Sequence, residues 1–466
     1  MRKHRYRTFS AVILICFAVL TVFMAWHARN FKIDASADTL LVKDNKHYIQ
    51  SQIADQRYNP EEFILIAFKP NSGEIFSEST LDLITSISQD ILTIDRVDKV
   101  NSLANVPIFL AADSLSSNID PAAISWETQR FSAEKMGYYL NGHPLYQGLL
   151  FNEERDALAM QVTFKDNDKN SQLSRDITDI RKHLLKRDLN EEEQRKLEAL
   201  KEEKDEIDQK LNTTRTQEIE KIQSILSSYE NEGAFHMGGN NLLAYQLISI
   251  IKSDLTIFGG VIVIIITLLL SFLFRHWLWV TLPLLCCAVS VTLTLGFLAL
   301  LGLKVTVISA NVIALQIILT LAVIIHLIVH YQEKSQSNRI HHMDCVLQTI
   351  KEKAKPCFYA GLTTAIGFGS LIFSGVQPVI SFGWMMVVAM SISIAVSLVL
   401  FPAMLILLSK QILPSQSHIF LRKVLAYLAN LVERRGKALL VASALVLAVG
   451  IIGSFRLTAE NSFLNY

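Results

Sequence analysis

The sequence predicts a multi-pass α-helical membrane protein with a large α+β domain outside the membrane. The chain has 466 residues, of which 51% are hydrophobic and 19% charged. The hydrophobic residues gather in seven long apolar runs, and a polar region from about Phe31 to Asp254 separates the first run from the other six. A formal net charge of +1 gives no reason to expect nucleic-acid binding.

Each apolar run is long enough to cross a bilayer as a helix, which takes about 20 apolar residues. Backbone groups inside hydrocarbon must pair within the segment, so the runs are predicted to be helices. The first run lacks a clear cleavage site after Trp26, which favours an uncleaved span over a signal peptide. The predicted spans are 9–26, 255–274, 277–301, 305–329, 358–374, 379–408 and 438–455.

Basic residues predict the orientation of the spans, because cytoplasmic segments are enriched in Lys and Arg. The tail 1–8 has four, the loop between the fourth and fifth spans has five, and the connector 409–437 has six. The N-terminus is therefore expected in the cytoplasm and the domain 27–254 outside. In the connector, apolar residues recur at helical spacing, as in Phe420, Val424 and Leu428. Both an interfacial helix and an ordinary amphipathic connector fit this pattern.

The outer domain is predicted to contain two small strand–helix–strand subdomains. The first comprises strands near 62–68 and 97–106 around a helix at 77–92. The second comprises a strand at 157–164, a helix from about Leu173 and a strand-turn near 235–241.

A charged helical arm is expected between them, at 186–229. The triplet 212–214 (Asn-Thr-Thr) is predicted to break this arm into a hairpin. A solvated arm and a partner-binding coiled coil remain alternatives.

Two short segments of the chain resemble each other. Phe31–Leu40, after the first span, matches Phe455–Leu464, after the seventh, with identical Phe, Ala and Leu positions. The match predicts that 438–455 begins a second copy of the whole unit and that 456–466 starts a second outer domain. Chance similarity is the alternative.

The fifth span carries the sequence Thr363-Thr364-Ala365-Ile366-Gly367-Phe368. With the order of spans, it resembles the resistance–nodulation–division superfamily, especially its MMPL branch of lipid and amphiphile exporters. The resemblance implies an N-terminal transporter half plus the first helix of a second half, in the bacterial inner membrane. It implies a periplasmic porter-like domain and a bundle, 255–408, similar to sterol-sensing domains. The expected partners are membrane lipids, an amphiphilic substrate, and a second half or a homo-oligomer.

Proton coupling in this superfamily uses an aspartate in the fourth span, and Val323 occupies the matching position here. None of the seven predicted spans contains Asp or Glu. Gln316, Thr320 and His330 share a helical face with Val323, and His326 flanks that face. His326 is therefore a candidate proton relay, because imidazole titrates near neutral pH. The alternative is a neutral, packed His326.

In the fifth span, three glycines are predicted to let neighbouring helices approach closely, namely Gly361, Gly367 and Gly369. Thr363 and Thr364 are candidates for hydrogen bonds to the fourth span, including to His326.

The sequence has no nucleophile elbow, zinc-protease motif or phosphate-binding loop, so we expect neither an enzyme nor a cofactor. Two functions remain. One is an ion-gradient-driven transporter half for lipid-like substrates. The other is a membrane scaffold or lipid sensor without proton coupling, which the valine at position 323 favours.

Overall fold

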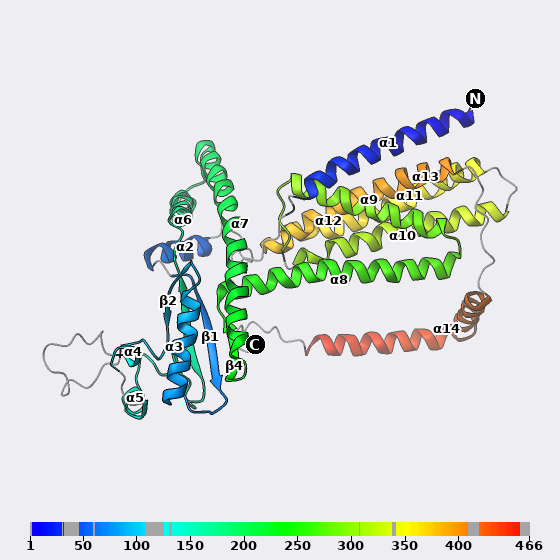
Figure 1. The fold of residues 1–466 in the computed structure, drawn as a ribbon. Helices are drawn as coiled ribbons and strands as arrows, with labels where there is room; N and C mark the ends of the chain where they lie inside the picture. Colours follow the sequence, from blue (N-terminus) through cyan, green and yellow to red (C-terminus); the bar gives the residue numbers. More distant parts are fainter. Residues whose placement is uncertain are drawn as a thin grey trace.

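The structure, a computed structural model, has a helical bundle with an α+β domain at one end (Figure 1). It describes residues 2–29, 31, 46–58, 61–107, 125–129, 133–306, 308–337, 342–408 and 419–456.

Seven helices in the described part of the chain are long and apolar enough to cross a membrane. This confirms the predicted multi-pass helical membrane protein. One of the seven spans consists of α12 and α13 joined through a π-helical turn at Val396–Leu400. The membrane helices are α1 (Arg2–Ala28), α8 (Asn240–Phe274), α9 (Leu278–Leu300), α10 (Val312–Ser337), α11 (His342–Gly369), α12 (Gln377–Ala395), α13 (Phe401–Leu407) and α14 (Ile419–Ser454).

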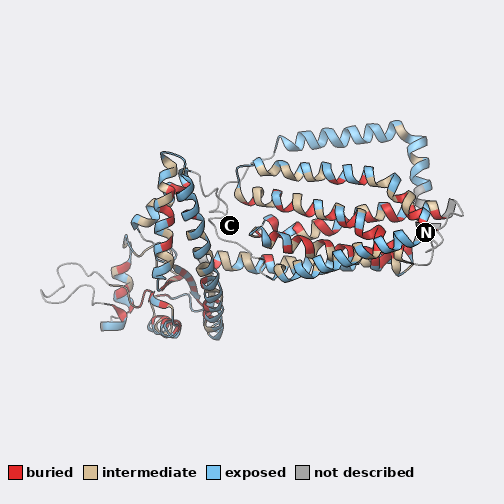
Figure 2. Ribbon diagram, turned by 90° about the horizontal axis from the view of Figure 1, so that it is seen from above, coloured by how far each residue is buried: buried red, intermediate tan, exposed pale blue. Residues whose placement is uncertain are grey.

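The core of the bundle lies among α9, α10 and α12, which have the largest buried shares among the membrane helices. Buried residues gather along these inner helices in Figure 2. Helix α1 packs closely on α9, since a Cβ built on Gly296 would lie 2.3 Å from the carbonyl oxygen of Met24. Helix α14 lies apart from the bundle (Figure 1), and its most apolar window has no buried residue.

Several helices extend beyond the predicted spans. Helix α8 starts at Asn240, well before the predicted start at 255, and connects the outer domain directly to the membrane. Helix α11 starts at His342, so much of the basic loop before the fifth span is helical. Helix α14 covers most of the predicted connector as well as the seventh span. The segments 409–418 and 457–466, and most of the first repeated segment, lie outside the described residues.

The outer domain is built on one four-stranded sheet with strand order β2-β3-β1-β4, in which all neighbouring strands are antiparallel. The two predicted strand–helix–strand units are present, but they share one sheet instead of forming two subdomains, because β3 of the second unit lies between β1 and β2 of the first. The two strand–helix–strand units interleave as a split βαβ arrangement. The strands are β1 (Phe63–Pro70), β2 (Val97–Asn101), β3 (Leu158–Phe164) and β4 (Gly233–Gly238).

Helices cover one face of this sheet. In β1, Ile64, Ile66 and Phe68 alternate with exposed residues and point into the domain core. The core is completed mainly by side chains of α3 and α7, while α6 packs on α7. The helices of the domain are α2 (Lys46–Tyr58), α3 (Glu78–Leu92), α4 (Trp126–Gln129), α5 (Ala133–Leu140), α6 (Asp168–Arg181) and α7 (Glu191–Ser228).

The predicted helical hairpin is wrong, because α7 is a single continuous helix. It begins with a capping box in which the Asn190 and Glu193 side chains each bond the other residue's backbone N–H. The triplet at 212–214 does not break it. The hydroxyls of Thr213 and Thr214 donate to the carbonyls of Gln209 and Lys210, one turn back.

Candidate functional site

Six buried polar side chains from three membrane helices meet inside the bundle. Each is at most 1% exposed, although apolar residues surround them. Polar groups at such a place need partners inside the protein, because hydrocarbon offers none. We call this cluster the polar core; its members are Ser290 and Thr294 of α9, Gln316 and Thr320 of α10, Ser393 of α12, and Ser397 of the π-helical turn.

Gln316 is the centre of one half of the polar core. Its Nε2 lies 3.0 Å from the carbonyl oxygen and 2.8 Å from the Oγ of Ser290, and 2.6 Å from the Oγ1 of Thr294. An amide nitrogen has two hydrogens, so it can satisfy two of these three acceptors at a time. The Oε1 of Gln316 is buried and has no hydrogen-bond partner within the described residues. The cluster therefore retains an unused acceptor.

Three hydroxyls form the other half. Thr320 Oγ1 donates to Ser393 Oγ at 2.9 Å, and Ser290 Oγ lies 3.3 Å from each of these oxygens. Ser397 Oγ donates to the carbonyl oxygen of Thr320 at 3.4 Å. The residue lies in the π-helical turn, a local insertion that is common at functional sites. The three helices are thus joined by neutral oxygens that neither gain nor lose protons near neutral pH.

The structure separates the residues predicted on α10. Gln316 and Thr320 point into the polar core, and Val323 is half-buried nearby. His326 is exposed on the outside of the bundle and makes no hydrogen bond or ion pair with any described residue. His330 lies toward the far end of the helix, where its Nε2 is 2.9 Å from Oε2 of Glu352 on α11.

The fifth-span residues do not join the site. Thr363 and Thr364 both donate to the carbonyl oxygen of Ala360, within their own helix. Neither therefore reaches α10, and the hydrogen bonds considered between them and His326 are not formed.

The three glycines of α11 differ in their surroundings. A Cβ on Gly361 would lie 2.5 Å from the Cδ1 of Ile394, so close approach to α12 occurs at this position. A Cβ on Gly369 would make an ordinary contact, 3.4 Å from Val387, and one on Gly367 would meet nothing within 4 Å. The prediction of close packing therefore applies to Gly361 and is wrong for Gly367.

Sequence reasoning missed four members of the polar core, Ser290, Thr294, Ser393 and Ser397. A serine or threonine in an apolar run usually bonds its own helix, as Thr292 does with the carbonyl of Ala288. The available signal was that the third, fourth and sixth spans each carry polar residues at similar depth, namely Ser290 and Thr294, Gln316 and Thr320, and Ser393 and Ser397.

A second buried polar cluster lies at the opposite end of the bundle from the outer domain. Tyr331 is fully buried, and its hydroxyl lies 2.7 Å from Nδ1 of His342. The Nε2 of His342 lies 2.8 Å from the carbonyl oxygen of Leu405, in the last turn of α13. A neutral imidazole satisfies both contacts, with Nε2–H donating and Nδ1 accepting. No sequence pattern places His342 inside the bundle, because it lies in the basic segment before the predicted fifth span.

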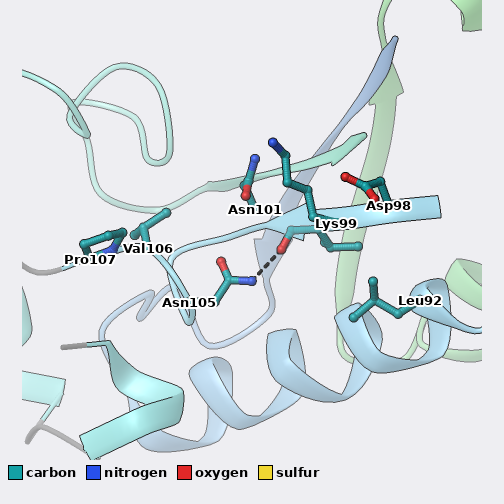
Figure 3. Close-up of a pocket in the computed structure, with 8 residues that line it drawn as sticks. Leu92, Asp98, Lys99, Asn101, Asn105, Val106 and Pro107 are labelled. Carbon is teal, nitrogen blue, oxygen red and sulfur yellow. Dashed lines mark hydrogen bonds between the residues drawn. The ribbon is translucent and has the colours of Figure 1, made fainter. Parts of the chain in front are cut away.

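Two pockets are lined by described residues of the outer domain. One, of about 350 Å³, lies over β2 and the segment after it, where Lys99, Asn101 and Asn105 line it (Figure 3). The other, of about 860 Å³, lies between the end of α7, β4 and the start of α8. Its wall combines apolar residues such as Phe235 and Leu242 with polar ones. A pocket of about 860 Å³ is large enough for a small-molecule ligand.

Partly buried ion pairs attach α7 to the sheet. Arg215 contacts both carboxylate oxygens of Glu62, at 2.7 and 2.9 Å, and Arg96 contacts Glu62 at 3.0 Å. Burial alone would raise the pKa of Glu62, but the two arginines outweigh it and lower that pKa. Burial, with the nearby charge of Glu62, raises the pKa of Glu218. This charged cluster holds α7 against the sheet of the outer domain. Its residues lie far from those of the polar core in the sequence.

The family model of the MMPL family matches residues 207–439, half of the chain. The chain belongs to the MMPL family. This confirms the resemblance seen in the fifth span. No curated protein matches the chain.

The matched region of this MMPL-family protein begins inside α7 and ends inside α14. It contains all six residues of the polar core and the buried pair of Tyr331 and His342. Family members are transporters rather than enzymes, so the protein is a transporter-like membrane protein.

Proposed function

We propose that this protein is a secondary transporter, or one half of one, that moves lipid-like or amphiphilic molecules. We place it in the bacterial inner membrane, with the outer domain in the periplasm and the N-terminus in the cytoplasm. The observation that carries the proposal is the polar core, because six buried polar side chains from three helices hydrogen-bond to one another inside the bundle. Membership of a transporter family supports the same function.

The pocket of about 860 Å³ is the proposed capture site for the substrate. Its mixture of Phe235, Met237 and Leu242 with Gln223, Ser227 and Gln246 suits a molecule that has an apolar chain and a polar head. Helix α8 forms part of its wall and continues as a membrane span, so the pocket adjoins an element that moves with the bundle.

An ion gradient is the proposed energy source, since the sequence has no nucleotide-binding motif. We propose a second half, or a second copy of this chain, as the partner across the bundle. His326 on the exposed side of α10 is the proposed proton relay, in place of the carboxylate that Val323 lacks.

The test is gradient-driven movement of a fluorescent lysophospholipid in vesicles that contain the full chain. We expect Ser393→Ala to reduce the rate at least severalfold, because it removes an oxygen that Thr320 and Ser290 both face. Ser391→Ala is the matched control, since the Ser391 hydroxyl is exposed and bonds its own helix. Equal transport rates for the two variants would show that the polar core takes no part in transport.

The alternative is a lipid sensor or scaffold that does not transport. The absence of any ionisable side chain in the polar core favours it. It predicts that the protein binds the lysophospholipid but that no imposed pH or sodium gradient drives movement in either direction.

A further inference from the structure

Helix α14 consists of two parts that differ in direction. The backbone of Arg435 is not helical, with φ −122° and ψ 28°, and the helix bends there. Figure 1 shows the N-terminal part turning sharply away from the longer, apolar part. The apolar part has the hydropathy of a membrane span. The first part, 419–434, therefore leaves the end of a span at a steep angle, as a helix lying along a membrane surface does.

The sequence of this first part is strongly amphipathic. At helical spacing, one side carries Phe420, Val424, Leu428, Leu431 and Val432, whereas the opposite side carries charged and amide residues. The bundle does not cover Leu428 and Val432, two residues of this side whose side chains the structure describes. Leu428 is 47% exposed and Val432 is 62% exposed. An apolar side left open beside a membrane span is covered most simply by the lipid next to it.

Three basic residues, Arg434, Arg435 and Lys437, lie at the bend, and Lys423 lies three turns earlier on the polar side. All four are exposed, and Glu433 is the acidic residue beside the bend. None of these four cations forms an ion pair with a carboxylate in the described part of the chain. The patch therefore has an excess of free positive charge at the level where phospholipid phosphates lie, which is charge complementarity to an anionic headgroup.

We propose that residues 419–437 form a binding site for anionic phospholipid, with the apolar side in the acyl-chain boundary and the basic residues on the headgroups. This site is separate from the polar core and the outer pocket, and it does not depend on the proposed transport. It would anchor the start of the seventh span at a fixed depth and favour a membrane rich in anionic lipid. The inference uses the predicted cytoplasmic location of 409–437, where anionic lipid attracts such patches.

The experiment uses the full chain in detergent micelles, titrated with dioctanoyl-phosphatidylglycerol or dioctanoyl-phosphatidylcholine. An environment-sensitive bimane label on Val432→Cys reports binding, in a Cys16→Ser background because Cys16 is the exposed cysteine among the five. We expect tighter binding of the anionic lipid and a blue shift of the label. Each basic residue near a lipid surface contributes about fivefold to affinity. The triple variant Arg434→Gln, Arg435→Gln, Lys437→Gln should therefore lower the preference about a hundredfold.

The matched control removes the same charge from α11, as Lys351→Gln, Lys353→Gln, Lys355→Gln, and should keep the preference. Added salt should weaken the preference of the parent protein, because the contacts are exposed. Equal affinity for the two lipids, or a preference that survives the triple variant of the bend, would overturn the proposal. Displacement of the lipid by millimolar inorganic phosphate would also overturn it, since the site would then bind phosphate alone.

Discussion

The two sides of α10 should respond very differently to substitution. Gln316 and His326 lie on the same membrane helix, but Gln316 is buried in the polar core and His326 is exposed without a partner among the described residues. We expect Gln316→Leu to destabilise the bundle and His326→Ala to leave its stability almost unchanged. The comparison tests the geometry of α10 directly, and it does not require a transport assay.

The magnitude follows from the contacts of the Gln316 amide. Its Nε2 can donate two hydrogen bonds at a time, to acceptors between 2.6 and 3.0 Å away. Hydrogen bonds between membrane helices contribute about 0.6 kcal/mol each on average and about 1.7 kcal/mol at most. Leucine fills a similar volume and removes the unused Oε1, so no large cavity term is added. The expected loss is about 1 kcal/mol, against less than about 0.5 kcal/mol for His326→Ala.

The measurement is unfolding of the purified chain in mixed micelles with increasing dodecyl sulfate, followed by tryptophan fluorescence. Trp279 is fully buried in the bundle and contributes to that signal. Thr320→Val, which removes the hydroxyl that donates to Ser393, is a third variant with an expected loss of about 0.6 kcal/mol. If His326→Ala destabilises the protein as much as Gln316→Leu, the assignment of the buried side of α10 is refuted.

Three further predictions concern other contacts. Gly296→Leu should lower stability by about 1–3 kcal/mol, because its Cβ would clash with the backbone of Met24 on α1; an unchanged unfolding midpoint in mixed micelles would contradict this close packing. Glu62→Gln should cost about 2 kcal/mol at pH 7 in denaturant unfolding of the outer domain. Because folding lowers the pKa of Glu62, its ion pairs contribute stability that is fully present above the usual value of 4.5 and is lost as the pH falls through the lowered pKa. If the free energy of unfolding depends on pH in the same way in Glu62→Gln as in the parent protein, the assignment is contradicted. An ion pair between Asp205 and Lys304, 2.8 Å apart, joins α7 to the turn after α9. A double-mutant cycle with Asp205→Asn and Lys304→Gln should give a coupling energy of about 0.5 kcal/mol that disappears at high salt. A coupling energy that does not depend on salt would indicate a different contact.

The membrane spans were predictable because bilayer thickness and backbone hydrogen bonding leave few choices for a long apolar run. Their ends were not. Helix α8 begins as early as Asn240 because its first turns pack against the outer domain, where Leu242 is part of the core, and hydropathy does not record such a contact.

The arrangement of the sheet depends on contacts between residues far apart in sequence. The register that pairs Leu65 with both Gln161 and Gly238 is not encoded in any local pattern, so the two strand–helix–strand units looked like separate subdomains. The predicted hairpin at 212–214 is absent because tertiary contacts outweigh local propensity. Asn-Thr-Thr is a poor helix sequence by propensity, but Leu211 is buried and Arg215 is held by Glu62, so tertiary contacts keep the helix continuous.

Within the candidate site, the helical period of α10 predicted that Gln316, Thr320 and Val323 share a side, and Gln316 and Thr320 do face the same cluster. The period did not show which side is buried. That depends on the packing of α9 and α12, whose serines and threonines look the same in sequence whether they bond across helices or within their own.

The two buried polar clusters restrict where a proton can bind. Serine, threonine and glutamine do not titrate near neutral pH, so the polar core cannot carry one. As a neutral imidazole, His342 uses both ring nitrogens, with Nδ1 facing the Tyr331 hydroxyl and Nε2–H donating to the Leu405 carbonyl, so a further proton would have to reverse the direction of the Tyr331 hydrogen bond. His326 has no such contact with any described residue, and it is exposed on the same helix as Ile318 and Val329, which are both about half exposed. A charged imidazole facing lipid is costly. The proposed relay at His326 therefore requires the proposed partner, because only a second bundle packed on this side of α10 would give the proton an acceptor and a route.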